Sequence, residues 1–120
     1  MSKKTLVLGA SLKPDRYSNF AIKKLTNHKH EVKAIGLREG DVAGVVIEKG
    51  LQDFSDINTV TLYLNPKRQQ EYYDYIIDLK PERVIFNPGT ENPELYALLK
   101  AAGIEVEIAC TLVLLSTDQY

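Results

Sequence analysis

The sequence predicts an α/β fold in three layers, in which helices cover both faces of a five-stranded, mostly parallel sheet. Five short apolar runs alternate with segments whose apolar residues recur at helical spacing, and this alternation is typical of parallel strands joined by crossover helices. Two helix-start signals, Asn65-Pro66 and Asn92-Pro93, each place an N-cap asparagine before a proline at the first helical position. Residues 1–120 are expected to form a single domain.

The expected strands are the apolar runs themselves. The first run, from Thr5 to Leu8, is unbroken, and this predicts a strand buried on both faces. Residues 38–44 contain two glycines and are expected to form a loop, while Val45–Ile47 is a candidate for a short extra strand. The other expected strands are Glu31–Ile35, Thr59–Leu64, Arg83–Phe86 and Ile104–Ile108.

Helical spacing and capping residues predict the helices. The first helix is expected to begin near Ser18, whose hydroxyl can cap the first turn. Pro81 is expected to stop the second helix, and Gly103 to cap the end of the third. The predicted helices span 18–27, 66–80 and 93–102, with a brief helical turn over 51–54 and a closing turn or extra strand over 111–115.

The composition limits the classes of function. Of 120 residues, 44% are hydrophobic, as expected for a globular domain with a core. The 15 basic and 16 acidic residues give a net charge of −1, which argues against a nucleic-acid partner. The lone cysteine excludes an internal disulfide, and no apolar run reaches the roughly 18 residues of a membrane span. The first strand begins too early for a signal peptide, so the expected location is cytoplasmic.

The predicted topology places the functional site. Ligands of open parallel sheets bind outside the carboxyl ends of the strands. Glycine, small and polar residues follow all five expected strands at those ends. The segments concerned are 9–11, 36–38, 64–65, 87–90 and 109–111.

The segment after the first strand favours phosphate binding. Gly9 permits a tight turn and a close approach of backbone to ligand, Ser11 offers a hydroxyl, and Arg16 can pair with phosphate oxygens. The segment also opens a helix, whose N-terminus suits anions. It lacks the full G-x-G-x-x-G pattern, because Ser11 and Pro14 occupy the later glycine positions. An ordinary strand-to-helix turn remains the alternative.

Two further loops have functional and ordinary readings. Arg38 and Glu39 follow the second strand, where a dinucleotide-binding protein contacts the ribose, and a basic group there suits an extra ribose phosphate. The alternative is a solvated loop charge. Residues 87–92 can form a second polar cradle around Gly89, or a simple turn that ends in a helix cap.

Other reactive side chains are expected to lie elsewhere or to serve packing. Cys110 follows the last strand at the ligand edge, where it is either a small buried residue or a neighbour of the ligand's reactive end. His28 and His30 fall at the opposite edge and are expected on the surface, so a Ser–His triad or histidine metal site lacks its residues. Three tyrosines, at 72, 73 and 75, favour packing or a subunit contact.

These motifs, in this order, resemble the small standalone CoA-binding proteins of bacteria. That family is similar to the CoA-binding domain at the start of the succinyl-CoA synthetase alpha subunit. The resemblance covers about Thr5 to Leu114. It rests on Gly9-Ala10-Ser11 with Arg16 and Ser18, Leu62-Tyr63-Leu64-Asn65-Pro66, Asn87-Pro88-Gly89-Thr90-Glu91-Asn92, Ala102-Gly103-Ile104 and Cys110.

The resemblance implies a Rossmann-like fold and a CoA or acyl-CoA ligand. By position, the phosphates fall to Gly9, Ala10, Ser11, Arg16 and Ser18. The adenosine end falls to Gly36, Leu37 and Arg38, although the family often has Asn-Pro after the second strand where this chain has Gly36-Leu37. The rest of the cleft falls to Leu64, Asn65, Pro66, Pro88 and Gly89. The synthetase's phosphorylated histidine and ligase domains have no counterpart here, so the resemblance implies binding and not thioester ligation.

Three hypotheses therefore stand. The first is a CoA-binding module without chemistry of its own. The second is a small NAD(P)-dependent oxidoreductase or sensor, motivated by the first loop and Arg38. The third is a structural or regulatory partner that has lost its ligand, motivated by Gly36-Leu37 and by the tyrosine-rich helix. Under any of the three, a homodimer through a helix face is a possible arrangement.

Overall fold

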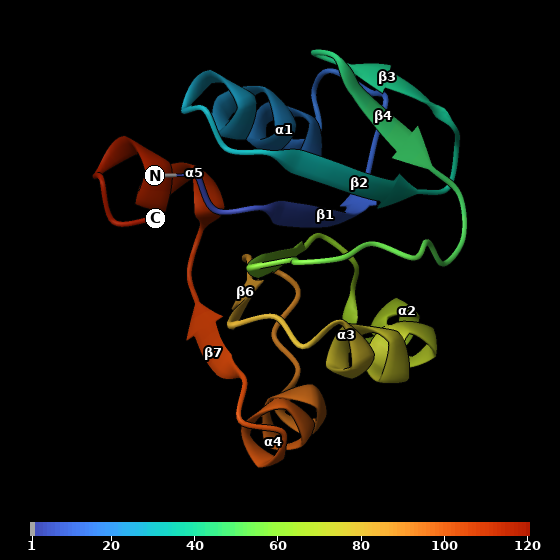
Figure 1. The fold of residues 1–120 in the computed structure, drawn as a ribbon, viewed down its shortest axis with the longest axis vertical. Coiled ribbons are helices and arrows are strands. Elements are labelled where there is room, and N and C mark those ends of the chain that lie inside the picture. The colour runs from blue at the N-terminus through green and yellow to red at the C-terminus, as the bar shows by residue number, and fades with distance from the viewer. Residues whose placement is uncertain (1) are drawn as a thin grey trace.

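A computed structural model describes residues 2–120 and shows a seven-stranded sheet in the order β3-β4-β2-β1-β5-β6-β7 (Figure 1). All neighbouring strands are parallel except the antiparallel pair β3–β4. The strands are β1 (Thr5–Ala10), β2 (Val32–Gly36), β3 (Gly40–Val42), β4 (Val45–Glu48), β5 (Thr59–Leu62), β6 (Arg83–Phe86) and β7 (Glu105–Ile108).

The prediction of five strands was wrong, because a hairpin extends one edge of the sheet. β4 corresponds to the short extra strand expected at Val45–Ile47 and pairs with β2. β3 was expected to be loop. Ala43 and Gly44 both have positive φ, 53° and 81°, and a two-residue turn of this kind matches the twist of the two strands that it joins. The glycines that indicated a loop therefore belong to a hairpin.

The helices lie on both faces of the sheet, which gives the three predicted layers. α1 and α5 cover one face, and α3 and α4 cover the other (Figure 1). No helix within residues 2–120 is long and apolar enough to cross a membrane. The helices are α1 (Tyr17–Asn27), α2 (Pro66–Gln69), the 3-10 turn η1 (Gln70–Tyr72), α3 (Tyr73–Leu79), α4 (Pro93–Ala101) and α5 (Thr111–Ser116).

The core explains why the central strands read as unbroken apolar runs. Leu6, Val7 and Leu8 of β1 are fully buried, because consecutive side chains point into opposite helical layers. Each such side chain stabilises the fold by about 1.5–3 kcal/mol relative to exposure. On the α3 and α4 side, the core includes Phe86 and Leu99.

Capping confirms two predicted helix starts and corrects a third. The side chains of Asn65 and Asn92 accept hydrogen bonds from the backbone N–H groups of Arg68 and Leu95, as predicted. The N-cap of α1 is Arg16, with no side-chain cap, and Ser18 is buried inside the first turn. Ser18 therefore does not cap the helix.

Two other expected helices differ from the structure. The predicted helix over 66–80 is divided into α2, η1 and α3, and it ends at Lys80 in the left-handed conformation (φ 51°). Residues 51–54 form no helix but belong to an irregular segment between β4 and β5. Phe54 still packs on the core, and the Tyr75 hydroxyl donates to the carbonyl of Gln52 at 2.6 Å. Residues 111–116 are helical, which resolves the helix-or-strand alternative.

Candidate functional site

A cleft of about 730 Å³ lies at the carboxyl ends of β1, β2, β5 and β6. Its size is within the range of small-molecule and cofactor pockets. All the residues predicted for the site line it except Pro66 and Cys110. Its lining consists of Gly9, Ala10, Ser11, Leu12, Lys13, Arg16, Tyr17, Ser18, Ile35, Gly36, Leu37, Arg38, Tyr63, Leu64, Asn65, Arg68, Tyr72, Pro88, Gly89 and Thr90.

Two glycines allow the strand ends to approach one another beneath the cleft. Gly9 has φ 98°, and a Cβ there would come within 3.0 Å of both Leu64 Cδ2 and the Tyr63 carbonyl carbon. A Cβ on Gly36 would lie 2.3 Å from the carbonyl oxygen of Ala10, which no real side chain tolerates. The pairing of β1 with β2 shifts register between Leu8 and Ala10, where Gly9 interrupts it. Glycine is therefore required at both positions for packing, whatever the ligand.

The loop after β1 is held by its own hydrogen bonds. The N–H of Lys13 donates to Ser11 Oγ at 3.1 Å, and the Asn19 side chain donates to the Ser11 carbonyl at 2.9 Å. The Arg16 N–H donates to the Lys13 carbonyl at 3.1 Å. These bonds fix the loop against the start of α1, where the N–H groups of Tyr17 and Ser18 make no backbone hydrogen bond within residues 2–120. An anion in the cleft would find those donors already placed.

The charge lining the cleft is entirely positive. Lys13, Arg16, Arg38 and Arg68 line it, and no aspartate or glutamate does. The ion pairs among residues 2–120 involve none of these four cations. Since the chain as a whole has a net charge of −1, the cleft concentrates positive charge that the rest of the molecule balances. Such a cleft attracts polyanions.

The wall opposite the glycine loop contains Arg68 and Tyr72, which were not predicted for the site, and Thr90, which belongs to the expected segment 87–90. Arg68 and Tyr72 follow β5 on α2 and η1, and Thr90 lies in the loop after β6. Tyr72 packs on the core, as expected, and it also lines the cleft. Burial raises the pKa of Tyr72, with a smaller contribution from Glu71. Arg68 could have been found from the sequence, because it lies in the first helical turn after Asn65, at the carboxyl edge of the sheet.

Tyr63 is another lining residue that was not predicted. Its hydroxyl lies beside the hydroxyls of Thr61 and Thr111, but no bond of good geometry joins it to any residue within 2–120. Thr61 and Thr111 instead bond each other at 2.8 Å, and Asn87 donates to Thr61 at 2.7 Å. Burial is the main cause that raises the pKa of Tyr63, so its phenol stays neutral.

Cys110 and Pro66 lie outside the cleft lining. Cys110 is the half-buried N-cap of α5, directly after β7 at the far edge of the sheet. The carboxyl-edge prediction was sound, but β5 and β6 separate β7 from β1. Directly after Cys110 the chain turns back toward the centre of the sheet, since Thr111 bonds Thr61 of β5 at 2.8 Å. Pro66 is half-buried at the first position of α2.

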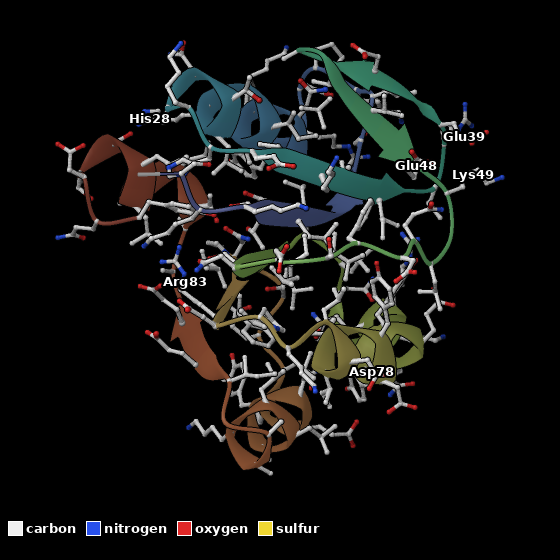
Figure 2. All side chains as sticks on the ribbon, in the orientation of Figure 1. His28, Glu39, Glu48, Lys49, Asp78 and Arg83 are labelled. Carbon is white, nitrogen blue, oxygen red and sulfur yellow. The ribbon has the colours of Figure 1, made fainter. Side chains whose placement is uncertain are left out.

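The amino edge of the sheet is built differently. The Tyr120 ring lies between His30, at 4.9 Å between ring centroids, and the Arg83 guanidinium, at 4.5 Å. The Tyr120 and Thr5 hydroxyls are 2.6 Å apart, and Lys3 Nζ donates to the Tyr120 carbonyl at 2.9 Å. Figure 2 shows His28 and Arg83 toward the left of the view and Glu39 toward the right, at opposite ends of the central strands.

The two histidines differ from each other in burial. His28 is exposed, as expected, whereas His30 is half-buried and its Nδ1 accepts from the Lys3 N–H at 3.0 Å. The expected surface position therefore applies fully to His28 and only in part to His30. Neither histidine lines the cleft. Within residues 2–120, no group of three or more His, Cys, Asp or Glu side chains could hold a metal ion.

The comparison with family profiles assigns the chain to a family. The sequence profile of a family described as CoA binding domain matches residues 3–116. No curated protein matches the chain. An uncharacterized protein of known crystal structure is 47% identical, with a TM-score of 0.97, and the match covers 100% of this chain and 99% of that one.

Two further solved structures are also similar. A hypothetical protein from Pyrococcus horikoshii OT3 is 30% identical, with a TM-score of 0.83 over 93% of this chain and 80% of that one. A protein from Thermus thermophilus is 22% identical, with a TM-score of 0.86 over 99% of this chain and 91% of that one, and this likeness concerns the fold alone. Because the family profile spans almost the whole chain, the protein belongs to the CoA-binding domain family.

Proposed function

We propose that the chain binds coenzyme A, free or with a short acyl group, in the cleft at the carboxyl edge of its sheet and acts as a binding module. The charge of the lining carries this proposal: four cations and no carboxylate surround the cleft. CoA has a pyrophosphate and a ribose phosphate, so it is a polyanion that such a lining suits. Membership of the CoA-binding domain family supports the same ligand.

The glycine loop is proposed to hold the pyrophosphate. Gly9, Ala10 and Ser11 bring backbone to the floor of the cleft, and Ser18 lies in the first turn of α1. The N-terminus of that helix favours negative charge. Arg16, its N-cap, is placed to pair with a phosphate oxygen.

The order of the strands supports one direction for the proposed ligand. On the β2 side, Gly36, Leu37 and Arg38 are proposed to hold the adenosine end, with Arg38 at the ribose phosphate. The Leu37 side chain is 66% exposed at the rim, where it offers apolar surface to a base. The neutral pantetheine arm is then proposed to cross the β5 and β6 side, along Leu64, Asn65, Pro88 and Gly89. Cys110 and Pro66 have no part in this arrangement.

A thermal-shift screen against CoA, acetyl-CoA, NAD, NADP and ADP tests the proposal. A ligand at 100 times its dissociation constant stabilises the folded state by about 2.7 kcal/mol, so saturating CoA is expected to raise the melting temperature clearly. NAD is expected to have a smaller effect, because it lacks the ribose phosphate that Arg38 would contact. No shift with any CoA compound would refute the proposal.

A nicotinamide cofactor is the second candidate. Arg38 after β2 also suits the ribose phosphate of NADP. Stabilisation by NADP without stabilisation by CoA would favour a hydride-transfer protein or sensor.

A further inference from the structure

We propose that Gln69 is a positioning residue for the ligand, because it fixes the cleft wall that receives the pantetheine arm. The inference rests on the proposed function. Gln69 is the last residue of α2 and is fully buried. It does not line the cleft, so any effect on the ligand passes through the residues that it holds.

The Gln69 amide joins the two loops that form this wall. Its Nε2 donates to the carbonyl of Leu64, in the loop after β5, at 2.8 Å. The same nitrogen donates to the carbonyl of Thr90, in the loop after β6, also at 2.8 Å. Asn92 Nδ2 donates to Gln69 Oε1 at 2.9 Å. Both Leu64 and Thr90 line the cleft.

This arrangement uses the full donor capacity of one side chain. A primary amide has two N–H groups and one carbonyl oxygen, and here each N–H reaches a different loop while the oxygen is held by Asn92. Asn92 also donates to the Tyr73 hydroxyl at 2.8 Å and caps α4 through its Oδ1. The orientation of the Gln69 amide is therefore fixed from both ends.

The bridge acts on one half of the cleft only. Its bonds end on residues 64, 90 and 92, whereas the phosphate loop is held by Ser11 and Asn19 through separate bonds. Loss of the bridge would leave two carbonyls without their donor and free the loops after β5 and β6 to move. The affinity for the pantetheine arm should fall, and the affinity for the nucleotide half should not.

Isothermal titration of Gln69→Met with CoA and with adenosine 3′,5′-bisphosphate tests this inference. Methionine keeps the length of the side chain and removes all three hydrogen bonds. CoA affinity is expected to fall roughly tenfold, which corresponds to about 1.4 kcal/mol, while the affinity for the bisphosphate stays within about twofold of wild type. Gln70→Met is the matched control, since Gln70 is exposed and adjacent, and both affinities should match wild type.

Asn92→Asp gives a second test in case Gln69→Met folds poorly. Aspartate preserves the cap of α4, since its carboxylate can accept from the Leu95 N–H. It cannot donate to Gln69 Oε1, so the Gln69 amide is expected to turn its NH₂ toward the carboxylate and away from the two carbonyls. The same selective loss of CoA affinity is expected, and melting curves confirm that the variant folds.

Each remaining outcome decides against the inference. An equal loss of affinity for CoA and the bisphosphate would make Gln69 a general structural residue, and unchanged affinity for both would remove it from the site. Wild-type protein that binds the bisphosphate but not CoA, or neither ligand, would refute the proposed function and the inference with it. If the wild-type protein binds CoA but the variants lose affinity for CoA and the bisphosphate equally, the inference about Gln69 is refuted and the proposed function is not.

Discussion

The two edges of the sheet carry similar charged and aromatic side chains but use them in opposite ways. At the amino edge, Arg83 is 8% exposed, bonds Glu107 and Thr59, and lies against the Tyr120 ring. At the carboxyl edge, Arg16 and Arg38 are exposed and lie outside the ion pairs found within residues 2–120. The cation of the amino edge is paired with a carboxylate of the same chain, whereas Arg16 and Arg38 at the carboxyl edge are in none of these ion pairs and face the cleft. Substitutions at the amino edge should therefore change mainly stability, and substitutions of cleft cations at the carboxyl edge should change mainly ligand binding.

Gly36→Ala is expected to reduce both the stability of the fold and the binding of CoA, because Gly36 lies in β2 and also lines the cleft. The added Cβ would lie 2.3 Å from the Ala10 carbonyl oxygen, and backbone cannot yield as a side chain does. A loss of about 3 kcal/mol in unfolding free energy is expected, with loss of CoA binding. Urea denaturation and a thermal shift with CoA measure the two effects.

Gly50→Asn is the control for this change. A Cβ on Gly50 meets nothing within 4 Å, and asparagine tolerates its positive φ of 74°. Stability should stay within about 0.5 kcal/mol of wild type. Equal stability of Gly36→Ala and Gly50→Asn would show that β1 and β2 can separate without cost.

Tyr120→Ala is expected to damage the amino edge and spare the cleft. It removes the ring between His30 and Arg83 and the hydroxyl at Thr5, so unfolding free energy should fall by about 2–3 kcal/mol. Tyr120→Phe removes only the hydroxyl and should cost about 1 kcal/mol. CoA affinity should be the same in both variants, as titration calorimetry at a temperature where both are folded would show. A large loss of affinity in either would mean that the edges are coupled.

Arg16→Ala is the converse change, since it should weaken binding and spare stability. A charge-assisted bond to phosphate is typically worth roughly 1.5–3 kcal/mol, so CoA affinity should fall accordingly while the melting temperature of the free protein holds. Lys23→Ala is the matched control, because Lys23 is an exposed cation on the same helix that does not line the cleft. Equal affinities of the two variants would exclude Arg16 from the site.

The pH dependence of stability gives the smallest expected effect. Burial, with His28 and Lys3 next, lowers the pKa of His30, and its Nδ1 accepts a bond that a proton there would abolish. As pH falls, the unfolded chain takes up the proton first. The contribution of neutral His30 to stability is therefore full above the unfolded-state pKa of about 6.5. It declines as the pH falls from there toward the lowered pKa of His30 in the folded protein.

Urea unfolding between about pH 7.5 and about pH 5 measures this contribution against His30→Gln. Wild-type protein should lose more stability than the variant over that range, and its CoA affinity should follow the same pH course as that of the variant. If both proteins lose the same stability over this range, the protonation of His30 does not contribute to the pH dependence.

The sequence predicted the elements whose signals are local. Asn65-Pro66 and Asn92-Pro93 start helices as expected, since cap and proline act within four residues. β3 was not predicted, because a strand of three residues that includes a glycine is too short to show an alternation of apolar and polar residues. The helix expected over 66–80 was divided because apolar spacing does not reveal a 3-10 turn at Gln70–Tyr72.

The site was predictable as far as topology decides it. The rule that ligands bind at the carboxyl ends of parallel strands selected the glycine loop, Arg38 and Pro88, and these residues line the cleft, while their contact with a ligand stays a prediction. It also placed Cys110 there, because chain order does not show that Cys110 caps a helix, α5, outside the cleft lining. Gln69 and Tyr63 were missed, since their positions depend on which side of an element faces the loops.

The hairpin β3–β4 has a consequence for how this protein behaves among its own copies. A sheet that ended on β4 would present a parallel strand to which further chains could add. Here the outermost strand is three residues long and reverses direction, and the other outer strand, β7, carries Glu105 and Glu107. Short and charged borders of this kind discourage strand-to-strand aggregation. The chain should therefore remain dispersed at high concentration, and removing those glutamates should be a sensitive way to make it form fibrils.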